Sequence, residues 1–415
     1  MSRKSRRDPG RLLAGVVMLF YFTAFGLLSL RTMDRLGMIF AVAVPAMIWI
    51  GTHLLPRLFP TDKLLLSLTN FLCALGILML YATCPRYAVH QAVSYGVGLV
   101  AMVVCIMLVR HVKQHSVSVW LLMPLALLFL ALPLLIGKEI NGATNWIRIS
   151  GHSVQPSELV KVALVIILSH WMSRRSMLPW LGFALVCLGL LMLQKDLGTA
   201  LMYYGVTLAL YYVSSGHVLL TGIGLLGGGA SAVLGYQMFA HVRKRVAIWR
   251  NPFGTANTSG YQIVQGLIAL ASGGLFGVGL GLGAPRTIPA YHTDYIFAVI
   301  CEQFGLIFGL CVLAMYVALV WRGATIAMGA RSSYHGLIAM GATVLIALQT
   351  FTIIGGVIKL IPLTGVTLPF VSYGGSSLVS SLCLIGLVQG VGSLNEDHLN
   401  QDTELATAVQ GGMRS

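Results

Sequence analysis

The sequence predicts an all-α polytopic membrane protein that crosses the bilayer about 12 times. Of its 415 residues, 57% are hydrophobic and only 9% are charged, whereas soluble domains carry about a quarter charged residues. Apolar stretches of about 20 residues, the length that a spanning helix needs, recur along the chain. Lys and Arg lie in alternate connections, so the positive-inside rule places those connections and both chain ends in the cytoplasm.

The predicted elements follow directly from the apolar stretches. A basic N-terminus, residues 1–10, leads into the first span, and the polar segment 395–415 is expected to be a disordered cytoplasmic tail. The predicted spans are 11–30, 36–55, 64–83, 90–110, 118–136, 158–172, 178–194, 198–213, 217–239, 294–321, 335–356 and 366–392.

The composition excludes several classes of protein. The net charge of +15 is spread between apolar runs, so we expect no nucleic-acid partner. Seven cysteines are scattered without a C-x-x-C pair, which predicts neither a disulfide framework nor a zinc site. The step Gly137-Lys138 is followed by Glu139, so the chain has no P-loop.

The outer side carries two longer loops, at about 137–157 and 240–293. The second contains Arg243, Lys244 and Arg245, a cluster that topology does not explain because long loops escape the charge rule. One interpretation is a helix end whose cations hold lipid headgroups. The other, which we favour, is a binding site for an anionic substrate.

The chain has only 12 acids, and one in or beside a membrane needs a partner or a role. Glu158 and Lys161 are three residues apart at a helix start, so they share a face and are expected to form a structural ion pair. Asp196, in QKDLGT, precedes another predicted helix. It either caps that helix or contacts a substrate.

Asp294 lies where the long outer loop turns into a helix, in the segment PAYHTDYIFAVICEQFG. Thr293 or Asp294 would serve as an ordinary helix N-cap. However, His292 is adjacent, and Glu302 follows Asp294 by eight residues, about 80° around a helix. This concentration of titratable groups at the membrane edge makes Asp294 a candidate catalytic residue.

Two further segments carry unusual residues for a membrane protein. Trp146 in NGATNWIRISGHSVQPSE is either an interfacial anchor or part of an outer binding loop. GVTLPFVSYGGSS places Pro369, Gly374 and Gly375 in the first turns of a span. Irregular backbone at that depth is tolerated mainly where it is buried in protein or lines a cavity.

Six motifs in order resemble the SEDS family of shape, elongation, division and sporulation proteins (FtsW/RodA/SpoVE). They are NGATNWI…QPSELVK, QKDLGTA, RKRVAIWRNP, GYQIVQG, HTDYIFAVICEQFG and TGVTLPFVSYGGSS, and the resemblance runs from about Leu64 to Val391. The family has a ten-helix core, which this chain would place at 64–394. Residues 11–63 would then be two additional N-terminal helices.

The resemblance implies a peptidoglycan glycosyltransferase. Such proteins polymerise lipid II, an undecaprenyl-diphosphate-linked disaccharide-pentapeptide, on the outer face of the cytoplasmic membrane, beside a class B penicillin-binding protein. The family's catalytic aspartate falls on Asp294, its paired charges on Glu158 and Lys161, and its loop tryptophan on Trp146. Residues expected to contact substrate are Arg243, Lys244, Arg245, Trp146, Gln194, Asp196, Tyr261, Gln262, His292, Thr293, Ser372 and Ser376.

The chemistry of glycosyl transfer agrees with these residues. Transfer to a sugar hydroxyl needs one base, which takes the proton of that hydroxyl. A diphosphate leaving group needs no acid, but its negative charge must be stabilised by cations or a metal. A helix N-terminus would weaken Asp294 as a base, so an alternative is that Asp294 holds Mg²⁺ or Mn²⁺ while His292 takes the proton. Two rival functions are a lipid II flippase or permease that uses Glu158, Lys161 and Glu302 as a charge relay, and a scaffold for the penicillin-binding partner.

Overall fold

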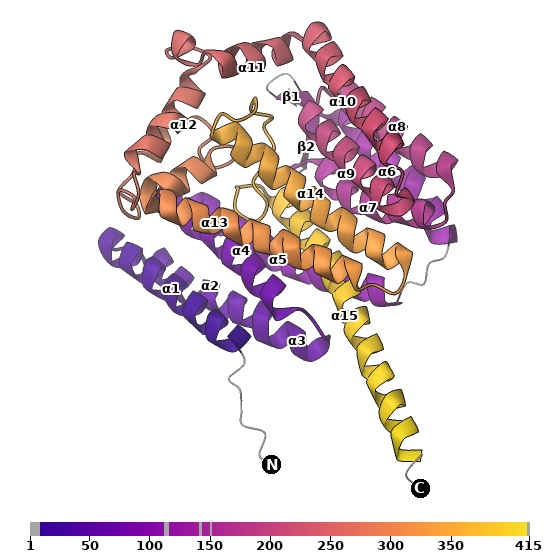
Figure 1. Cartoon of the computed structure of the whole chain (residues 1–415). Coiled ribbons are helices and arrows are strands. Elements are labelled where there is room, and N and C mark those ends of the chain that lie inside the picture. The colour runs from indigo at the N-terminus through magenta and orange to yellow at the C-terminus, as the bar shows by residue number, and fades with distance from the viewer. Residues whose placement is uncertain (1–8, 112–115, 141–142, 150–151, 413–415) are drawn as a thin grey trace.

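The computed structural model describes residues 9–111, 116–140, 143–149 and 152–412, and helices form most of it (Figure 1). Every predicted span coincides with a helix, although the number of membrane crossings stays a prediction. The helices are α1 Pro9–Thr32, α2 Arg35–Trp49, α3 Leu55–Leu58, α4 Lys63–Thr83, α5 Pro85–His111, α6 Ser116–Ile136, α7 Pro156–Ser173, α8 Met177–Leu193, α9 Leu197–Ser215, α10 Val218–Met238, α13 Ile296–Met328, α14 Ser333–Val357 and α15 Gly375–Gly412.

Nine of the helices in the described residues are long and apolar enough to cross a membrane. Three other predicted spans, α7, α8 and α9, are helices of 18, 17 and 19 residues that fall outside that group. The second predicted span is α2, which continues through a π-helical turn at Ile50–Leu54 into α3. The molecule is therefore a mostly helical, multi-pass membrane protein.

The fold is mostly helical, as expected, and one outer loop adds a short sheet. The outer loop at 137–157 forms a small antiparallel sheet in the order β1-β2-β3, with strands Lys138–Ile140, Ala143–Ile149 and His152–Val154. In the sequence, Asn-Gly and Ser-Gly steps separate these strands, and such dipeptides are typical of tight turns. A strand pattern this short is easily missed between long apolar helices.

The expectation of a disordered tail is wrong, because α15 continues as a helix to Gly412. Asp397 pairs with Arg110 of α5 at 2.9 Å, and Asp402 pairs with Arg331 of the α13–α14 connection. These ion pairs join the acidic tail to the basic connections of the core. Figure 1 shows the end of α15 and the start of α1 on the same side of the molecule, opposite the sheet and α11.

The predicted long loop at 240–293 contains two helices, α11 Ala240–Arg250 and α12 Tyr261–Ser272. A short 3-10 turn at Phe253–Thr255 lies between these two helices, and another at Pro285–Thr287 lies between α12 and α13. In Figure 1 these helices lie along the outer rim of the bundle, over the end of α14. They form the upper border of the site described below.

The last predicted span, 366–392, is wrong at its beginning because α15 starts only at Gly375. Residues 358–374, hereafter the α14–α15 loop, contain no helix. Pro362 and Pro369 interrupt helical hydrogen bonding, and Gly365 has a φ of 77° that disfavours other residues.

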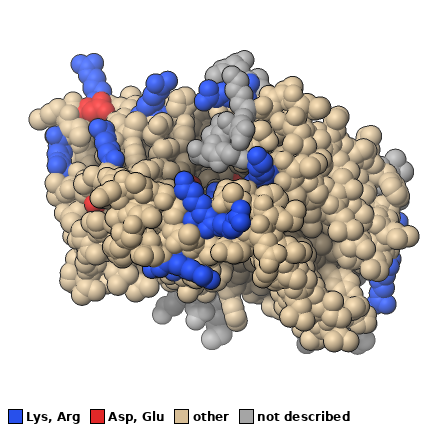
Figure 2. All heavy atoms as spheres, turned by 90° about the horizontal axis from the view of Figure 1, so that it is seen from above, with Lys and Arg blue, Asp and Glu red and all other residues tan. Residues whose placement is uncertain are grey.

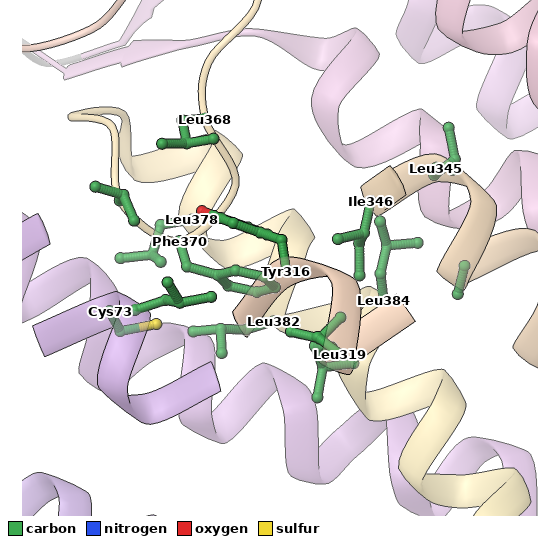
Figure 3. Close-up of a cluster of buried hydrophobic side chains, with 14 of the residues drawn as sticks. Cys73, Tyr316, Leu319, Leu345, Ile346, Leu368, Phe370, Leu378, Leu382 and Leu384 are labelled. Atoms are coloured by element: carbon green, nitrogen blue, oxygen red, sulfur yellow. The ribbon is translucent and has the colours of Figure 1, made fainter. Parts of the chain in front are cut away.

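The α14–α15 loop rests on buried side chains of the helices around it (Figure 3). Leu368 and Phe370 are almost fully buried with Leu378 and Leu382 of α15, and the Tyr316 hydroxyl of α13 donates to the carbonyl oxygen of Pro369. The loop therefore has a fixed position among the helices.

The loop also packs closely against α4, and this contact generates a prediction. A Cβ atom on Gly76 would lie 2.5 Å from the carbonyl oxygen of Val371. We expect Gly76→Ala to lower the free energy of unfolding by about 1–3 kcal/mol, the usual cost of overpacking. Thermal unfolding in detergent measures this change.

Gly182 on α8 is the matched control, because a Cβ atom there would meet nothing within 4 Å. Gly182→Ala should leave stability unchanged or raise it by up to about 1 kcal/mol, since alanine favours a helix over glycine. Equal melting temperatures for the two variants would contradict the close packing of the loop on α4.

Candidate active site

Asp294 and Arg245 approach each other over Gly365 of the α14–α15 loop. A Cβ atom on Gly365 would lie 3.9 Å from Oδ2 of Asp294 and 3.7 Å from Nη2 of Arg245. Arg245 Nη1 donates to the carbonyl oxygens of Thr364 at 2.8 Å and of Leu363 at 3.4 Å. The site therefore combines one carboxylate and one guanidinium around a residue without a side chain.

Asp294 lies in the turn that precedes α13, where its main-chain N–H donates to Ala290 O at 3.1 Å. The N-cap is Tyr295, so the alternative that Thr293 or Asp294 caps the helix is wrong. Burial raises the pKa of Asp294 to about 6, and a hydrogen bond from Thr293 and the charge of Arg245 oppose this rise. The environment thus makes the carboxylate a better base than one in water.

Two hydrogen bonds join the Asp294 turn to the α14–α15 loop. The Ser372 hydroxyl donates to Thr293 O at 2.6 Å, and the Tyr373 N–H donates to His292 O at 2.8 Å. The Ser372 side chain is only 3% exposed, and its oxygen also accepts from the Leu368 N–H. Ser372, which we predicted to contact substrate, therefore holds the backbone beside Asp294.

His292 lies in a group of aromatic rings next to Asp294. Its ring stacks on Tyr87 of α5 with a centroid distance of 4.8 Å, and it meets the edges of Tyr291 and Tyr373 at 5.1 and 5.7 Å. Burial lowers the pKa of His292, which favours the neutral imidazole. Tyr87 was missed by sequence reasoning because nothing near it in the sequence connects α5 to the Asp294 turn.

The predicted basic cluster separates into different faces of α11. Arg243 and Arg245 are two residues apart, so at about 100° per residue they point in nearly opposite directions. Arg245 faces the loop, as does Trp249, whose Nε1 donates to Lys359 O at 3.1 Å. All three cations of the cluster are exposed, but Arg243 and Lys244 lie on other faces of α11 than Arg245. Figure 2 shows Lys and Arg gathered on this face, with few Asp or Glu side chains visible.

A second group of predicted substrate residues lies at the base of the sheet. Asp196 caps α9 by accepting from Thr199 N at 3.1 Å, and it also accepts from the Asn145 and Gln155 amides at 2.8 and 3.0 Å. The cap is thus the alternative that the structure forms. Gln194 is 0% exposed and donates to Leu130 O at 2.6 Å, so it offers no surface to a substrate in this conformation.

The remaining predicted contacts lie in three different elements. Trp146 is half-buried in β2, where it pairs with Lys138. Gln262, in the first turn of α12, donates to Pro289 O at 3.2 Å, and its neighbour Tyr261 is exposed. Ser376 is half-buried in the first turn of α15.

The predicted pair of Glu158 and Lys161 is present and buried in α7. Nζ of Lys161 lies 2.6 Å from Oε2 of Glu158 and donates to Gln349 Oε1 at 2.8 Å, while the Ser380 hydroxyl donates to Glu158 at 2.9 Å. Glu302 is used elsewhere, because its Oε1 accepts from the Ala284 N–H at 3.0 Å. These partners give each charge a structural role and weaken the case for a charge relay.

The residues that the structure describes contain no group of three or more His, Cys, Asp and Glu side chains that could hold a metal ion. A divalent cation at this site would therefore depend on Asp294 together with oxygens of the substrate. Mg²⁺ is commonly bound in that way, by one or two carboxylates and substrate phosphates.

Comparisons with known proteins agree with the motifs. The family model for FtsW, RodA and SpoVE, described as a cell cycle protein, matches residues 63–396. Peptidoglycan glycosyltransferase RodA of Mycobacterium tuberculosis (strain H37Rv) is 34% identical over 81% of this chain and 80% of that protein. Stage V sporulation protein E of Bacillus subtilis is 34% identical over 80% of this chain and 96% of that protein.

Two solved structures are similar in fold. One comes from work on the structural coordination of polymerization and crosslinking by a peptidoglycan synthase complex. It has a TM-score of 0.68 and 28% identity, and the match covers 81% of this chain and 98% of that chain. The other, Thermus thermophilus rod shape determining protein RodA, has a TM-score of 0.60 and 27% identity, over 81% of this chain and 98% of that one. Helices α1–α3 precede the region matched by the family model.

The buried ion pair generates a prediction about stability. Glu158→Gln and Lys161→Met should each lower the free energy of unfolding by about 3–5 kcal/mol, because each leaves one uncompensated charge in a low dielectric. The double variant should be more stable than the sum of these losses predicts. Thermal unfolding of the four proteins measures the coupling, and additive losses would show that the two charges do not stabilise each other.

Proposed function

Because this chain belongs to the FtsW/RodA/SpoVE family and is a peptidoglycan glycosyltransferase, we propose that it polymerises lipid II with Asp294 as the general base. The observation that carries this proposal is the approach of Asp294 and Arg245 over Gly365. A base and a cation are the two groups that transfer from a sugar diphosphate requires.

In the proposed reaction, a hydroxyl of the acceptor sugar attacks the anomeric carbon of the donor sugar. The new glycosidic bond forms as the bond between the anomeric carbon and the diphosphate oxygen breaks, with inversion at that carbon. The hydroxyl proton passes to Asp294, and the undecaprenyl diphosphate leaves with the bonding electron pair. A carboxylate with a pKa near 6 is ionised at neutral pH and still accepts a proton readily.

Arg245 is the cation that we assign to the leaving diphosphate. Its Nη1 is held by two loop carbonyls, so the guanidinium is preorganised, and preorganised charge stabilises a developing anion without reorganisation. Arg243 and Lys244, on other faces of α11, would attract the anionic lipid to the same rim. In the alternative arrangement, Asp294 would hold Mg²⁺ or Mn²⁺, which would supply positive charge for the leaving diphosphate, and His292 would take the hydroxyl proton.

The surroundings of the reaction are part of the same proposal. Both described ends of the chain lie opposite α11, which supports cytoplasmic termini and a site on the outer face (Figure 1). The similarity to a chain from a peptidoglycan synthase complex supports a class B penicillin-binding protein as the cross-linking partner. The family serves elongation, division or sporulation, and any of these would use the same transfer.

We expect Asp294→Asn to abolish polymerisation, because the amide has nearly the same size but cannot accept the hydroxyl proton. The measurement is glycan chain formation from lipid II by purified protein in liposomes. A labelled lipid II in the same liposomes tests the flippase alternative, since a flippase would move the lipid across the bilayer without lengthening glycan. Glycan synthesis by the folded Asn variant would remove Asp294 from its assigned role.

The pH dependence of polymerisation should identify the base. Below a pH of about 6 the fraction of ionised Asp294 falls, so kcat should fall with decreasing pH and level off above that value. His292→Gln should keep this acidic limb if Asp294 is the base. Loss of the limb in His292→Gln would instead favour the arrangement with a metal on Asp294.

Arg245 and Arg243 provide a matched pair on one helix. Arg245→Ala should lower kcat/KM by about tenfold or more, the effect of losing one charge-assisted contact to phosphate, and Arg245→Lys should recover little of it. Arg243→Ala should have a smaller effect, which added salt should reduce, because its charge acts at longer range. Steady-state polymerisation rates against lipid II concentration test this order, and equal losses for the two residues would contradict it.

A further inference from the structure

Gln349 connects the buried ion pair to the α14–α15 loop. It lies on α14 and is 2% exposed. Its Oε1 accepts from Nζ of Lys161 at 2.8 Å, and its Nε2 donates to the carbonyl oxygen and to the hydroxyl of Thr367 at 2.8 and 3.2 Å. Because an ammonium can only donate and a carbonyl can only accept, these partners fix the orientation of the amide.

The loop carries this connection to the reacting groups. Thr367 lies three residues from Thr364, whose carbonyl oxygen accepts from Arg245, and five residues from Ser372, whose hydroxyl donates to the Asp294 turn. Gly365, where Asp294 and Arg245 meet, lies between Thr364 and Thr367. A displacement of Thr367 would therefore move the backbone under both reacting groups.

The physical environment makes this connection strong. A backbone carbonyl buried at membrane depth without a hydrogen bond costs several kcal/mol, so the loop backbone follows the donor that satisfies it. Glu158 lies 2.6 Å from Nζ of Lys161 and compensates its charge, and the ammonium in turn orients Gln349. The amide of Gln349 thus links the loop to α7, and the Thr367 hydroxyl also lies 2.6 Å from Oγ of Ser377 on α15.

We propose that Gln349 is a positioning residue for glycosyl transfer, which sets the separation of Asp294 and Arg245 by holding the loop at Thr367. This inference rests on the proposed function of that site. Gln349 does not contact the reacting groups itself, so its loss should lower kcat more than it changes KM. Misplacement of reacting groups by about 1 Å can cost about a hundredfold in rate.

Gln389 on α15 is the matched control, because it is chemically equivalent but remote. It is 0% exposed, and its amide accepts from the Asp62 N–H at 2.8 Å and donates to the Asp62 carbonyl at 3.0 Å. It therefore also ties one helix to the backbone of another segment. Asp62 precedes α4 and pairs with Arg322, at the end of the bundle away from the loop.

The experiment compares Gln349→Leu, Gln349→Glu and Gln389→Leu as purified full-length proteins with lipid II. We expect both Gln349 variants to lower kcat between about tenfold and a hundredfold, with KM changed by less than about threefold. Gln349→Glu keeps an acceptor for Lys161, but it loses the N–H groups that hold Thr367 and adds a buried carboxylate, so it should also lose melting temperature; the double-mutant cycle below separates this loss from the positioning role. Gln389→Leu should lose melting temperature while its kcat stays within about twofold of wild type.

A double-mutant cycle with Arg245→Ala separates positioning from general destabilisation. If Gln349 acts through the carbonyls that hold Arg245, then Gln349→Glu should cost much less rate in the Arg245→Ala background than in the wild type. Gln389→Leu should show no such coupling. Additive rate losses for Gln349→Glu and Arg245→Ala would overturn the proposal, as would a wild-type kcat in Gln349→Glu.

The outcomes distinguish this inference from the function on which it rests. A wild-type protein that forms no glycan from lipid II would overturn the proposed function and the positioning role with it. An active wild type and an inactive Asp294→Asn variant, together with fully active Gln349 variants, would overturn the positioning role alone. If Gln349→Leu does not fold, Gln349→Glu decides the outcome, because it preserves the contact to Lys161.

Discussion

The site depends on a stretch of backbone that lies among helices without being helical. Within a bilayer, such backbone survives only where protein groups satisfy its N–H and C=O groups. In the α14–α15 loop, side chains from three different helices do so. The amide of Gln91 on α5 bonds Ser372 O at 2.9 Å, Gln349 on α14 bonds Thr367, and the Tyr316 hydroxyl on α13 donates to Pro369 O. The loop is thus positioned by the bundle rather than by its own local structure.

This dependence explains how Asp294 and Arg245 can lie near each other without neutralising each other. Arg245 donates to loop carbonyls, which hold its charge beside the carboxylate without tying the two groups in a tight ion pair. A tight ion pair would lower the pKa of Asp294 and make it a poor base. Burial instead raises that pKa to about 6, while Arg245 remains near enough to stabilise an anion. In the proposed reaction, the loop carbonyls therefore keep the base and the cation apart.

The sequence predicts the features that have a local signal. The length of the apolar stretches located the helices. The small number of acids in and beside the membrane pointed to Asp294 and to Glu158 with its partner Lys161. Contacts between distant segments have no such signal, so Tyr87, Gln91 and Gln349 were missed although each one holds the loop or the Asp294 turn. The helical tail was missed for the same reason, since its ion pairs to Arg110 and Arg331 join it to distant segments. Composition alone makes that segment resemble a disordered tail.

On the other side of the Asp294 turn, hydrogen bonds from a loop likewise satisfy backbone groups that are not in a regular helix. Helix α13 breaks at Gly305, where φ is 87°, and the break frees the carbonyls of Glu302 and Gln303. Val278 N and Gly279 N of the preceding loop donate to these carbonyls at 2.9 and 3.0 Å.

That loop is in turn contacted by α1, because Nη1 of Arg31 at the end of this helix donates to Gly281 O at 3.2 Å. The first turns of α13, which begin just after Asp294, are thus fixed at both ends: by the α14–α15 loop at one end and by the loop before α13 at the other. Since α1 reaches the second of these loops, this additional helix is connected to the support of the Asp294 turn, although it lies outside the region matched by the family model.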